Sequence, residues 1–467
     1  MDAFGSVKTA HPANDGARHA EGQPLARPGW AEAVLTLLLY LQLAAGGAND
    51  GPGSALAAIA QAGAVIAILL TVPPTSRFWH HARVPLYLLA GALAWAAIPA
   101  LLPASLRDTL GMAEHPAPDL FVLEWSKAAA AALTLTIAAL LGYRAGTARA
   151  LVQWIAAAGV IYLGYAAIDA IDWLADSQHG TRYAGTIGNT NAAGIVFAAI
   201  ALLGGGVALA PEETARWQRI GALAATGVAL ILCAMTGSRS AILLAVLLGV
   251  VMLALRRREV ADRHLTWRRM LPGTLLLVAL MIAAAMLTPV ANRSGYLPED
   301  AASRGAIIAH YAAISAEAPI WGFGAGSFFA VNLHTLTSGT APLYWNFGAA
   351  HNAPLQAAIE IGWPGLLLNL GAIGAILFAI ARARRDWWST VALCAIGAIA
   401  GSAMIDIALN VPAIVALTCL LLGGAWGAAL RSGSRARRRQ AQRHPHRDGR
   451  VRRDREQAVT EAAVEPR

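Results

Sequence analysis

Apolar segments long enough to cross a lipid bilayer alternate with short polar segments along almost the whole chain. A transmembrane helix needs about 20 mostly apolar residues, because the hydrocarbon core is about 30 Å thick and a helix rises about 1.5 Å per residue. The pattern predicts an all-α fold, a polytopic transmembrane bundle of about twelve helices. They are expected near residues 31–47, 55–72, 84–102, 120–142, 150–174, 192–210, 217–235, 239–255, 270–289, 353–380, 389–408 and 412–430.

The composition supports a membrane protein. Hydrophobic residues make up 57% of the chain and charged residues 13%, whereas soluble proteins carry about 25% charged residues. Residues 1–29 are polar and lack the short apolar core of a cleavable signal peptide. We therefore expect nothing to be removed and the first apolar segment to remain as a membrane helix.

Arginine placement predicts the orientation of the helices, because Lys and Arg in short loops stay on the cytoplasmic side. With the N-terminus inside, the Arg-containing connections all fall inside, and twelve crossings return the C-terminus to the cytoplasm. The expected organisation is a cytoplasmic segment 1–29, a transmembrane domain 30–430 and a disordered basic tail 431–467. The inward connections carry Arg77 and Arg83, Arg144 and Arg149, Arg216 and Arg219, the block 256–269, and Arg382, Arg384 and Arg385.

The Arg-rich tail supplies much of the net charge of +9. Such a tail can bind nucleic-acid phosphates without sequence preference, or it can bind anionic lipids of the inner leaflet. We favour membrane lipids over nucleic acid. The cysteines Cys233, Cys394 and Cys419 lie in apolar segments without paired spacing, which predicts neither a disulfide framework nor a thiolate metal site.

One outward connection is long, at residues 290–350, and we place it in the periplasm. Ile307, Ile308, Tyr311 and Ile314 recur in it at helical spacing, which predicts a short amphipathic surface helix that also carries Arg304. The glycine-rich stretch WGFGAGSF follows. It lacks the Lys-Ser/Thr ending and the preceding strand of a phosphate-binding loop.

The stretch HNAPLQAAIEIGWPG, residues 351–365, begins a long apolar segment with polar side chains. Asn352, Gln356 and Glu360 are spaced by four and therefore line one helix face over about 12 Å. Polar groups at that depth usually face a bundle interior or a water-filled cavity. The stripe marks a functional pathway or bonds neighbouring helices. Pro364 leaves the carbonyl of residue 360 without its usual donor, which predicts a bend.

His351 is expected at the outer mouth of this helix. A neutral imidazole there can take a proton from a hydroxyl at ambient pH. The alternative is a histidine lying among lipid headgroups.

The stretch MTGSRSAILL joins two predicted membrane helices. Ser238 suits the N-cap position, and Arg239 then falls in the first helical turn, where a cation opposes the helix dipole. An anion bound at that terminus would relieve the conflict, which favours a phosphate site. The alternative is an arginine that snorkels to lipid phosphate.

Two polar clusters have simpler structural interpretations. In GTIGNTNAAG, Asn189 and Asn191 are typical turn and cap residues, with a binding role as the alternative.

Three aspartates near the outer end of the fifth helix can hold a divalent cation, but pairing with a nearby arginine such as Arg182 is favoured. Asp406 is expected to be another such partner. The aspartates are Asp169, Asp172 and Asp176. The sequence holds no HExxH motif or His/Cys cluster that would predict a transition-metal site.

Four stretches together resemble the O-antigen ligase and O-antigen polymerase superfamily. His351-Asn352 followed by Gly362 and Gly365 resembles its histidine signature, and TGSRSAIL resembles its Ser-Arg motif. SRGAIIAHYAAISAEAPIWGFGAGSF resembles its loop of an arginine, a helix and a Gly-x-Gly turn, and GTIGNTNAAG resembles its Asn-x-Asn segment. The resemblance covers about residues 180–370, and the basic tail is not part of it.

The resemblance implies a metal-independent inverting glycosyltransferase without a cofactor, in the bacterial inner membrane, with its active site facing the periplasm. The donor would be a glycan linked to undecaprenyl diphosphate. His351 would be the general base, and Arg239 and Arg304 would bind the donor diphosphate. Supporting roles fall to Ser238, Asn189, Asn191, Asn352, Gln356 and Glu360.

The acceptor separates the activities within this superfamily. The lipid A core makes the enzyme an O-antigen ligase, which we favour; a second lipid-linked glycan makes it an O-antigen or exopolysaccharide polymerase, and a protein makes it an O-oligosaccharyltransferase. Twelve helices also suit a transporter. Against that class, the two halves show no similarity, and the polar residues gather at one face instead of the midplane.

Overall fold

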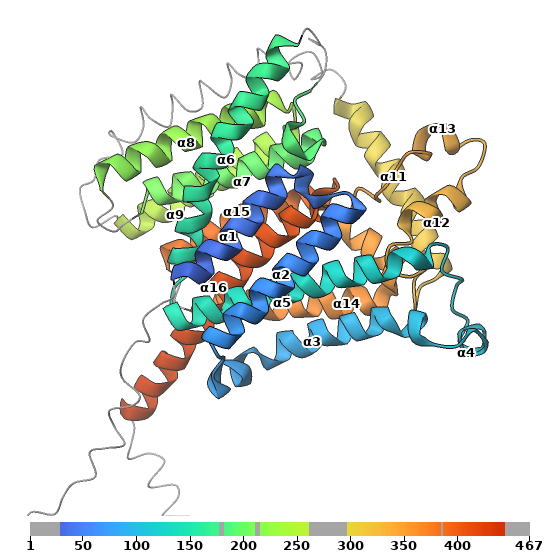
Figure 1. Ribbon diagram of the computed structural model, residues 1–467, viewed down its shortest axis with the longest axis horizontal. Helices are drawn as coiled ribbons and strands as arrows, with labels where there is room; N and C mark the ends of the chain where they lie inside the picture. The colour runs from blue at the N-terminus through green and yellow to red at the C-terminus, as the bar shows by residue number, and fades with distance from the viewer. Residues whose placement is uncertain (1–28, 177–181, 211–214, 261–296, 384–385, 444–467) are drawn as a thin grey trace, which may run out of the picture.

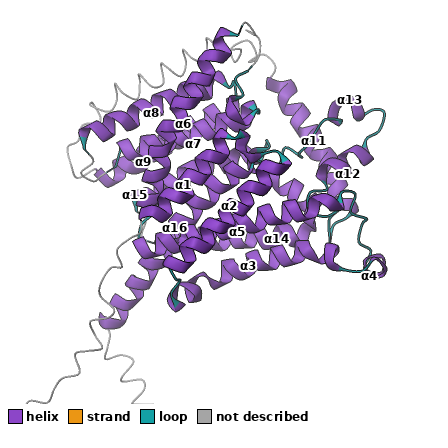
Figure 2. Ribbon diagram, viewed as in Figure 1, coloured by secondary structure: helices purple, strands orange, loops and turns teal. Residues whose placement is uncertain are grey.

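The computed structural model describes residues 29–176, 182–210, 215–260, 297–383 and 386–443. Within these ranges the chain forms helices joined by turns, with no strand (Figure 1, Figure 2). The long helices are α1 (Gly29–Ala44), α2 (Gly51–Thr71), α3 (Ser76–Leu101), α5 (Phe121–Ala145), α6 (Arg149–Ala175), α7 (Thr190–Ala208), α8 (Arg216–Met235), α9 (Arg239–Val260), α14 (Ala353–Arg382), α15 (Trp387–Ala403) and α16 (Pro412–Arg443).

The short elements lie between the long helices. The connection predicted to face outward contains α11 (Leu297–Glu317), α12 (Phe328–Thr335) and α13 (Ala341–Tyr344), which gather at the right of Figure 1 with α4 (Ala104–Thr109). Three 3-10 turns, η3 (Gly46–Ala48), η5 (Gly185–Ile187) and η7 (Ala408–Asn410), connect long helices at the same end as His351. A fourth, η4 (Pro118–Leu120), precedes α5.

The helix pattern confirms the predicted polytopic bundle. In the described ranges, nine helices are long and apolar enough to cross a membrane, and α1 and α15 are shorter apolar helices. Each predicted span in those ranges coincides with one of them. The predicted span 270–289 lies outside the described residues, as do residues 1–28 and 444–467 of the predicted terminal segments. Helix α16 continues from the predicted end at residue 430 to Arg443.

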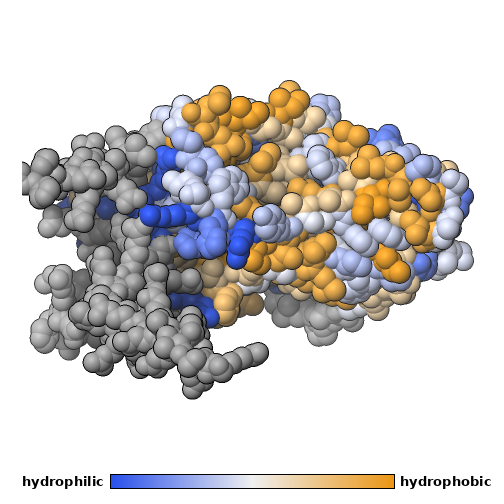
Figure 3. Space-filling model, turned by 90° about the horizontal axis from the view of Figure 1, so that it is seen from below, coloured by the Kyte–Doolittle hydropathy of each residue, from blue (hydrophilic) through white to orange (hydrophobic). Residues whose placement is uncertain are grey.

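The molecule presents an apolar surface suited to lipid. Large apolar side chains on several long helices are exposed, among them Leu70, Tyr87, Ile161 and Leu367. On the face seen in Figure 3, hydrophobic residues cover much of the middle of the molecule, and hydrophilic residues gather toward the left. A soluble monomer rarely exposes so extended an apolar surface, so the bilayer accounts for it.

Connections predicted to be cytoplasmic meet at one end of the bundle. Arginine side chains at this end donate hydrogen bonds to backbone carbonyls of neighbouring connections, which satisfies carbonyls that a helix end leaves free. These bonds join Arg144 to Pro73, Arg431 to Tyr143 and Arg256 to Leu209. The connections α2–α3, α5–α6 and α7–α8 therefore share one face with the ends of α9 and α16.

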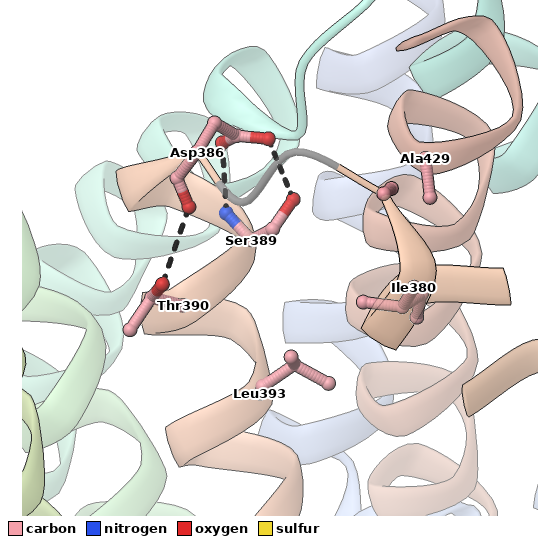
Figure 4. Close-up of a pocket in the computed structure, with 7 residues that line it drawn as sticks. Ile380, Asp386, Ser389, Thr390, Leu393 and Ala429 are labelled. Carbon is pink, nitrogen blue, oxygen red and sulfur yellow. Dashed lines mark hydrogen bonds between the residues drawn. The ribbon is translucent and has the colours of Figure 1, made fainter. Parts of the chain in front are cut away.

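A small cavity lies at the start of α15 (Figure 4). Its volume of about 10 Å³ holds at most one water molecule. Asp386 caps α15 beside it, because its carboxylate accepts hydrogen bonds from the Ser389 amide at 2.9 Å and the Ser389 hydroxyl at 2.8 Å. The cavity is thus part of a helix cap and is too small for a sugar.

Helices α5 and α16 pack through small residues. A β-carbon added to Gly427 would lie 1.9 Å from the carbonyl oxygen of Ala139, and one added to Gly142 would lie 2.2 Å from the carbonyl oxygen of Gly424. Glycines at such positions let two membrane helices approach closely, which strengthens their van der Waals packing.

Gly427→Ala is therefore expected to destabilise the bundle by about 1–3 kcal/mol, because the added methyl group forces the two backbones apart. Thermal unfolding of the purified protein in detergent measures the effect. Gly164→Ala in α6 is the matched control, since a β-carbon at Gly164 meets no atom within 4 Å. Equal melting temperatures for the two variants would contradict the described packing.

Candidate active site

Helix α14 is broken one third of the way along its length. Gly362 has φ 70° and ψ 172°. This conformation lies outside the helical region and strongly favours glycine. Pro364 has no amide hydrogen to donate to the carbonyl of Glu360. The break leaves carbonyl and amide groups without partners inside their own helix, in agreement with the bend predicted from Pro364.

The glycine-rich stretch 321–328 supplies those partners. The amide of Phe323 donates to the carbonyl of Ile359 at 2.8 Å, and the amide of Gly324 donates to the carbonyl of Glu360 at 2.9 Å. Gly322 lies so close that an added β-carbon would be 2.6 Å from the Glu360 carbonyl carbon. The Gly-x-Gly turn and the glycines of the histidine stretch therefore form one structural unit.

Two further hydrogen bonds complete the junction. The indole of Trp95 in α3 donates to the carbonyl of Ile361 at 3.1 Å, and the amide of Trp363 donates to the carbonyl of Pro319 at 2.9 Å. Trp95 also stacks on Trp321, with ring centroids 4.3 Å apart. The break in α14 is thus connected to α3 and to the loop that follows α11.

His351 lies immediately before α14 and faces a buried carboxylate. Its Nδ1 is 3.7 Å from Oδ1 of Asp406, whose side chain is 2% exposed, whereas the His351 side chain is 33% exposed. The same Asp406 oxygen accepts the Ile407 amide at 2.8 Å. The distance between Nδ1 of His351 and Oδ1 of Asp406 exceeds that of a hydrogen bond, and the imidazole nitrogen faces the carboxylate.

Asn352, Gln356 and Glu360 form the predicted polar stripe at the start of α14. Asn352 caps α14, because its Oδ1 accepts the Leu355 amide at 2.9 Å. One turn further, the Gln356 amide nitrogen donates to Glu360 at 3.1 Å. The Gln356 oxygen accepts Asn410 at 2.6 Å, so the stripe faces the connection between α15 and α16.

At its deeper end the stripe meets α5. Glu360 interacts electrostatically with Glu124 and Lys127, which form an ion pair with an N–O distance of 2.8 Å. These charged groups lie within segments long enough to span a membrane, where unpaired charges are costly. The ion pair offsets part of that cost.

The Ser-Arg turn lies against the Asn-x-Asn segment. Arg182 donates from Nε to the Thr236 carbonyl at 2.8 Å and from Nη2 to Oδ1 of Asn191 at 2.6 Å. Ser238 is buried at the N-cap position, and Arg239 is the first residue of α9 and half-buried. The predicted helix-terminal position of Arg239 is therefore correct.

Asn189 has the cap role that the sequence favoured. Its Oδ1 accepts the amides of Asn191 and Ala192, both at 3.0 Å, at the start of α7. Asn191 differs, because its side chain receives the guanidinium of Arg182.

The 3-10 turns lie between the segment around His351 and the Ser-Arg turn at Arg239. A β-carbon added to Gly47 of η3 would lie 2.6 Å from Val411 and 3.6 Å from Ile187. Val411 follows η7, and Ile187 belongs to η5. The connection 404–411, which faces His351, and the Asn-x-Asn segment, which lies against the Ser-Arg turn, therefore meet at one end of the bundle.

Arg304 lies apart from these contacts, on an exposed part of α11. The helix itself confirms the predicted amphipathic element, because Tyr311 and Ile314 are buried against residues that include Phe328 and Leu355. Ile308 was expected on the apolar face but is 38% exposed. It is rotated about 100° from Ile307, which does pack on the cluster.

Two aspartates have partners other than the arginines that the sequence suggested. Asp169 accepts a hydrogen bond from the Tyr183 hydroxyl at 2.8 Å, and Asp406 lies beside His351. Burial, followed by this hydrogen bond, raises the pKa of Tyr183 well above its usual value, so its hydroxyl stays protonated and donates. Arg182 instead donates a hydrogen bond to the Thr236 carbonyl in the Ser-Arg turn.

Sequence reasoning missed Asp406 and Asn410 as site residues. Both lie in the short connection 404–411, where a single polar residue has many possible partners. Among the described residues, no three His, Cys, Asp or Glu side chains are grouped to hold a metal ion.

Residues 222–370 match the protein-family model described as O-antigen ligase. Over these residues the chain is similar to O-antigen ligases. No curated protein matches the sequence. The O-antigen ligase match spans about a third of the chain and includes Arg239, Arg304 and His351, whereas Asp406 and Asn410 lie beyond it.

Gly362→Ala tests the junction in α14, at a position within the segment that matches the O-antigen ligase model. Its positive φ is strained for alanine, and the added β-carbon would lie 2.1 Å from the Ile320 carbonyl oxygen. We expect a lower melting temperature together with loss of glycan transfer, because the glycine turn can no longer fill the break. Gly374→Ala in the same helix, where a β-carbon meets no atom within 4 Å, is expected to behave as wild type. A Gly362→Ala protein that matched this control would contradict the described junction.

Proposed function

We propose that this protein transfers glycan from undecaprenyl diphosphate to a hydroxyl of the lipid A core, at the periplasmic face of the bacterial inner membrane. The coarser assignment rests on the O-antigen ligase domain in a multi-pass helical protein, which supports a ligase- or polymerase-type transfer between lipid-linked substrates. The observation that carries the finer proposal is the His351–Asp406 pair at the same end of the bundle as the Ser-Arg turn.

His351 acts as the general base. With Nδ1 directed at the Asp406 carboxylate, Nε2 of the neutral imidazole is the nitrogen that accepts the proton of the acceptor hydroxyl. The buried carboxylate stabilises the imidazolium that forms, as an acid does beside a catalytic histidine in hydrolases. A positioned base typically contributes about 10²–10⁴-fold to such a rate.

The bond changes are those of a single displacement. The acceptor oxygen forms a bond to the anomeric carbon, the bond from that carbon to the phosphate oxygen breaks, and the proton passes to His351. Undecaprenyl diphosphate leaves with the electron pair, and the configuration at the anomeric carbon inverts. The displacement is redox-neutral and needs no electron acceptor. It needs no metal in this proposal, because the lipid diphosphate is already a competent leaving group.

Arg239 and Arg304 bind the donor diphosphate. Arg239 is at the N-terminus of α9, where free amides and the helix dipole favour an anion in addition to the guanidinium. Arg304 is exposed on α11 and accessible to a phosphate. Two guanidiniums offset the negative charge that develops on the leaving diphosphate. Ser238 belongs to the turn that carries Arg239, Asn191 is joined to that turn through Arg182, and Asn189 caps α7 beside them.

The acceptor is tested by electrophoresis of lipopolysaccharide and lipid-linked glycan from a strain lacking the gene. A ligase predicts loss of the long ladder from the lipid A core and accumulation of polymer on the lipid carrier. Core bearing a single repeat would show a polymerase instead. An unchanged profile would overturn both and indicate another acceptor or a transporter.

His351→Ala is expected to abolish transfer without changing protein level or membrane insertion, because it removes the base and leaves the packing of the bundle intact. Complementation of the deletion strain provides the measurement. His334→Ala is the matched control, an exposed histidine of the same outer connection. Full transfer by His351→Ala would refute the base assignment.

Asp406→Asn is expected to lower the transfer rate by about tenfold or more, because a neutral amide no longer stabilises the imidazolium. Purified enzyme with a lipid-linked donor gives the rate directly. The substrate KM values are expected to change little. An unaltered rate would show that the 3.7 Å approach to His351 has no role in the reaction.

A further inference from the structure

His351 has a backbone conformation that its neighbours must hold. Its φ is 54°, in the left-handed region, which is uncommon for a residue other than glycine. Such conformations persist only where the surrounding structure determines them, and they cluster at functional sites. The contacts on either side of His351 therefore decide where its imidazole points.

Gln356 holds the residue before His351. Its Oε1 accepts the Ala350 amide at 3.3 Å and Nδ2 of Asn410 at 2.6 Å, and its Nε2 donates to Glu360 at 3.1 Å. The orientation of the Gln356 amide follows from its partners, because a backbone amide can only donate and the Glu360 carboxylate accepts. All three partners are satisfied in one orientation.

Asn352, the residue after His351, is held in place by its own side chain. Its Oδ1 caps α14, and its Nδ2 donates to the Met404 carbonyl at 2.9 Å. Met404, Asp406 and Asn410 all belong to the connection between α15 and α16. This connection thus contacts the histidine segment through a bond to Asn352, the carboxylate beside His351 and a bond to Gln356.

We propose that Gln356 and Asn410 are positioning residues that hold His351 in its left-handed backbone conformation and thereby direct its imidazole toward Asp406 and the acceptor hydroxyl. Neither side chain touches substrate. The inference rests on the proposed role of His351 as the base. A misplacement of about 1 Å can cost about 10²-fold in rate, so small shifts at residue 351 have large consequences.

Gln356→Met keeps the approximate size and shape of the side chain but removes its amide. Ala350 and Asn410 lose their acceptor, and Glu360 loses a donor. Asn410→Ala removes the opposite partner of the same hydrogen bond. If both residues act through His351, each variant lowers kcat by about ten- to hundredfold. The KM values of donor and acceptor stay within about twofold, since substrate contacts are unchanged.

The losses of kcat in the two single variants are expected not to be multiplicative. The double variant Gln356→Met/Asn410→Ala is expected to be no slower than the slower single variant, because the two side chains share one hydrogen bond. Asn369→Ala is the matched control. This asparagine lies in the same helix as Gln356, and its side chain donates a hydrogen bond to the Gly365 carbonyl of that helix. It is expected to have wild-type kcat.

The experiment uses the purified full chain in liposomes, with an undecaprenyl-diphosphate glycan as donor and lipid A core as acceptor, and reports kcat and both KM values. Melting temperatures of all variants are measured in parallel, and rates are compared at a temperature where each variant is folded. His351→Ala is included in the same series.

The outcomes separate this inference from the proposed function. An inactive His351→Ala together with unaltered Gln356→Met and Asn410→Ala would overturn the positioning role and leave the base assignment intact. A raised KM at constant kcat would overturn it too, because it indicates substrate contact. A fully active His351→Ala would refute the base assignment and, with it, the positioning role. Lowered kcat with constant KM, shared by both variants and absent from Asn369→Ala, supports the proposal.

Discussion

Backbone groups that lipid cannot satisfy determine the form of this site. A helix broken inside a membrane leaves carbonyl and amide groups unpaired, and irregular backbone is tolerated there only where protein buries it. Helix α14 breaks at Gly362, and the loop after α11 fills the break with the amides of Phe323 and Gly324. The loop after α11 must therefore return to the bundle and pack on it.

The break also gives the outer part of α14 two fixed ends. At the break, the glycine turn holds the carbonyls of residues 359 and 360. At the N-terminus, the Asn352 cap and its bond to Met404 hold the first turn. A helical piece of about ten residues, tied at both ends, places Gln356 and Glu360 at defined heights in the bundle. His351 immediately precedes this piece and takes its position from it.

The fold followed from hydropathy because the bilayer imposes a minimum length on every span, and arginine placement identified the end that carries the basic connections. The polar stripe followed from spacing, because residues four apart must share a helix face. The cap role of Asn189 and the terminal position of Arg239 are local, so neighbouring residues predict them. The close packing at Gly427 was not predictable from the sequence, because the approach of α16 to Ala139 involves residues nearly 300 positions apart.

The partners of the polar residues needed the structure for the same reason. Asp406 suits an arginine as well as a histidine, and the choice depends on how α15 ends relative to α14. Arg182 was near the aspartates in sequence, but its guanidinium reaches the Thr236 carbonyl 54 residues away. Tyr183, the adjacent residue, is the one that bonds Asp169. At Asp169 the partner is the buried hydroxyl of Tyr183, whereas the guanidinium of Arg182 bonds the turn beside Arg239.

The segment that matches the O-antigen ligase family is not sufficient to build the site. It contains His351 and Arg239, but the carboxylate that faces His351 and the amide that holds Gln356 come from the connection 404–411, after the match ends. On the other side, Arg182 and Asn191 precede the match and support its Ser-Arg turn. The 3-10 turns bring these flanking parts together at Gly47, Ile187 and Val411. Because one connection supplies Met404, Asp406 and Asn410 at once, a shift of that connection would change the electrostatic partner of His351 and the support of its backbone together. In the proposed reaction, correct placement of α15 and α16 is therefore a condition for the chemistry, although neither helix contributes a reacting group.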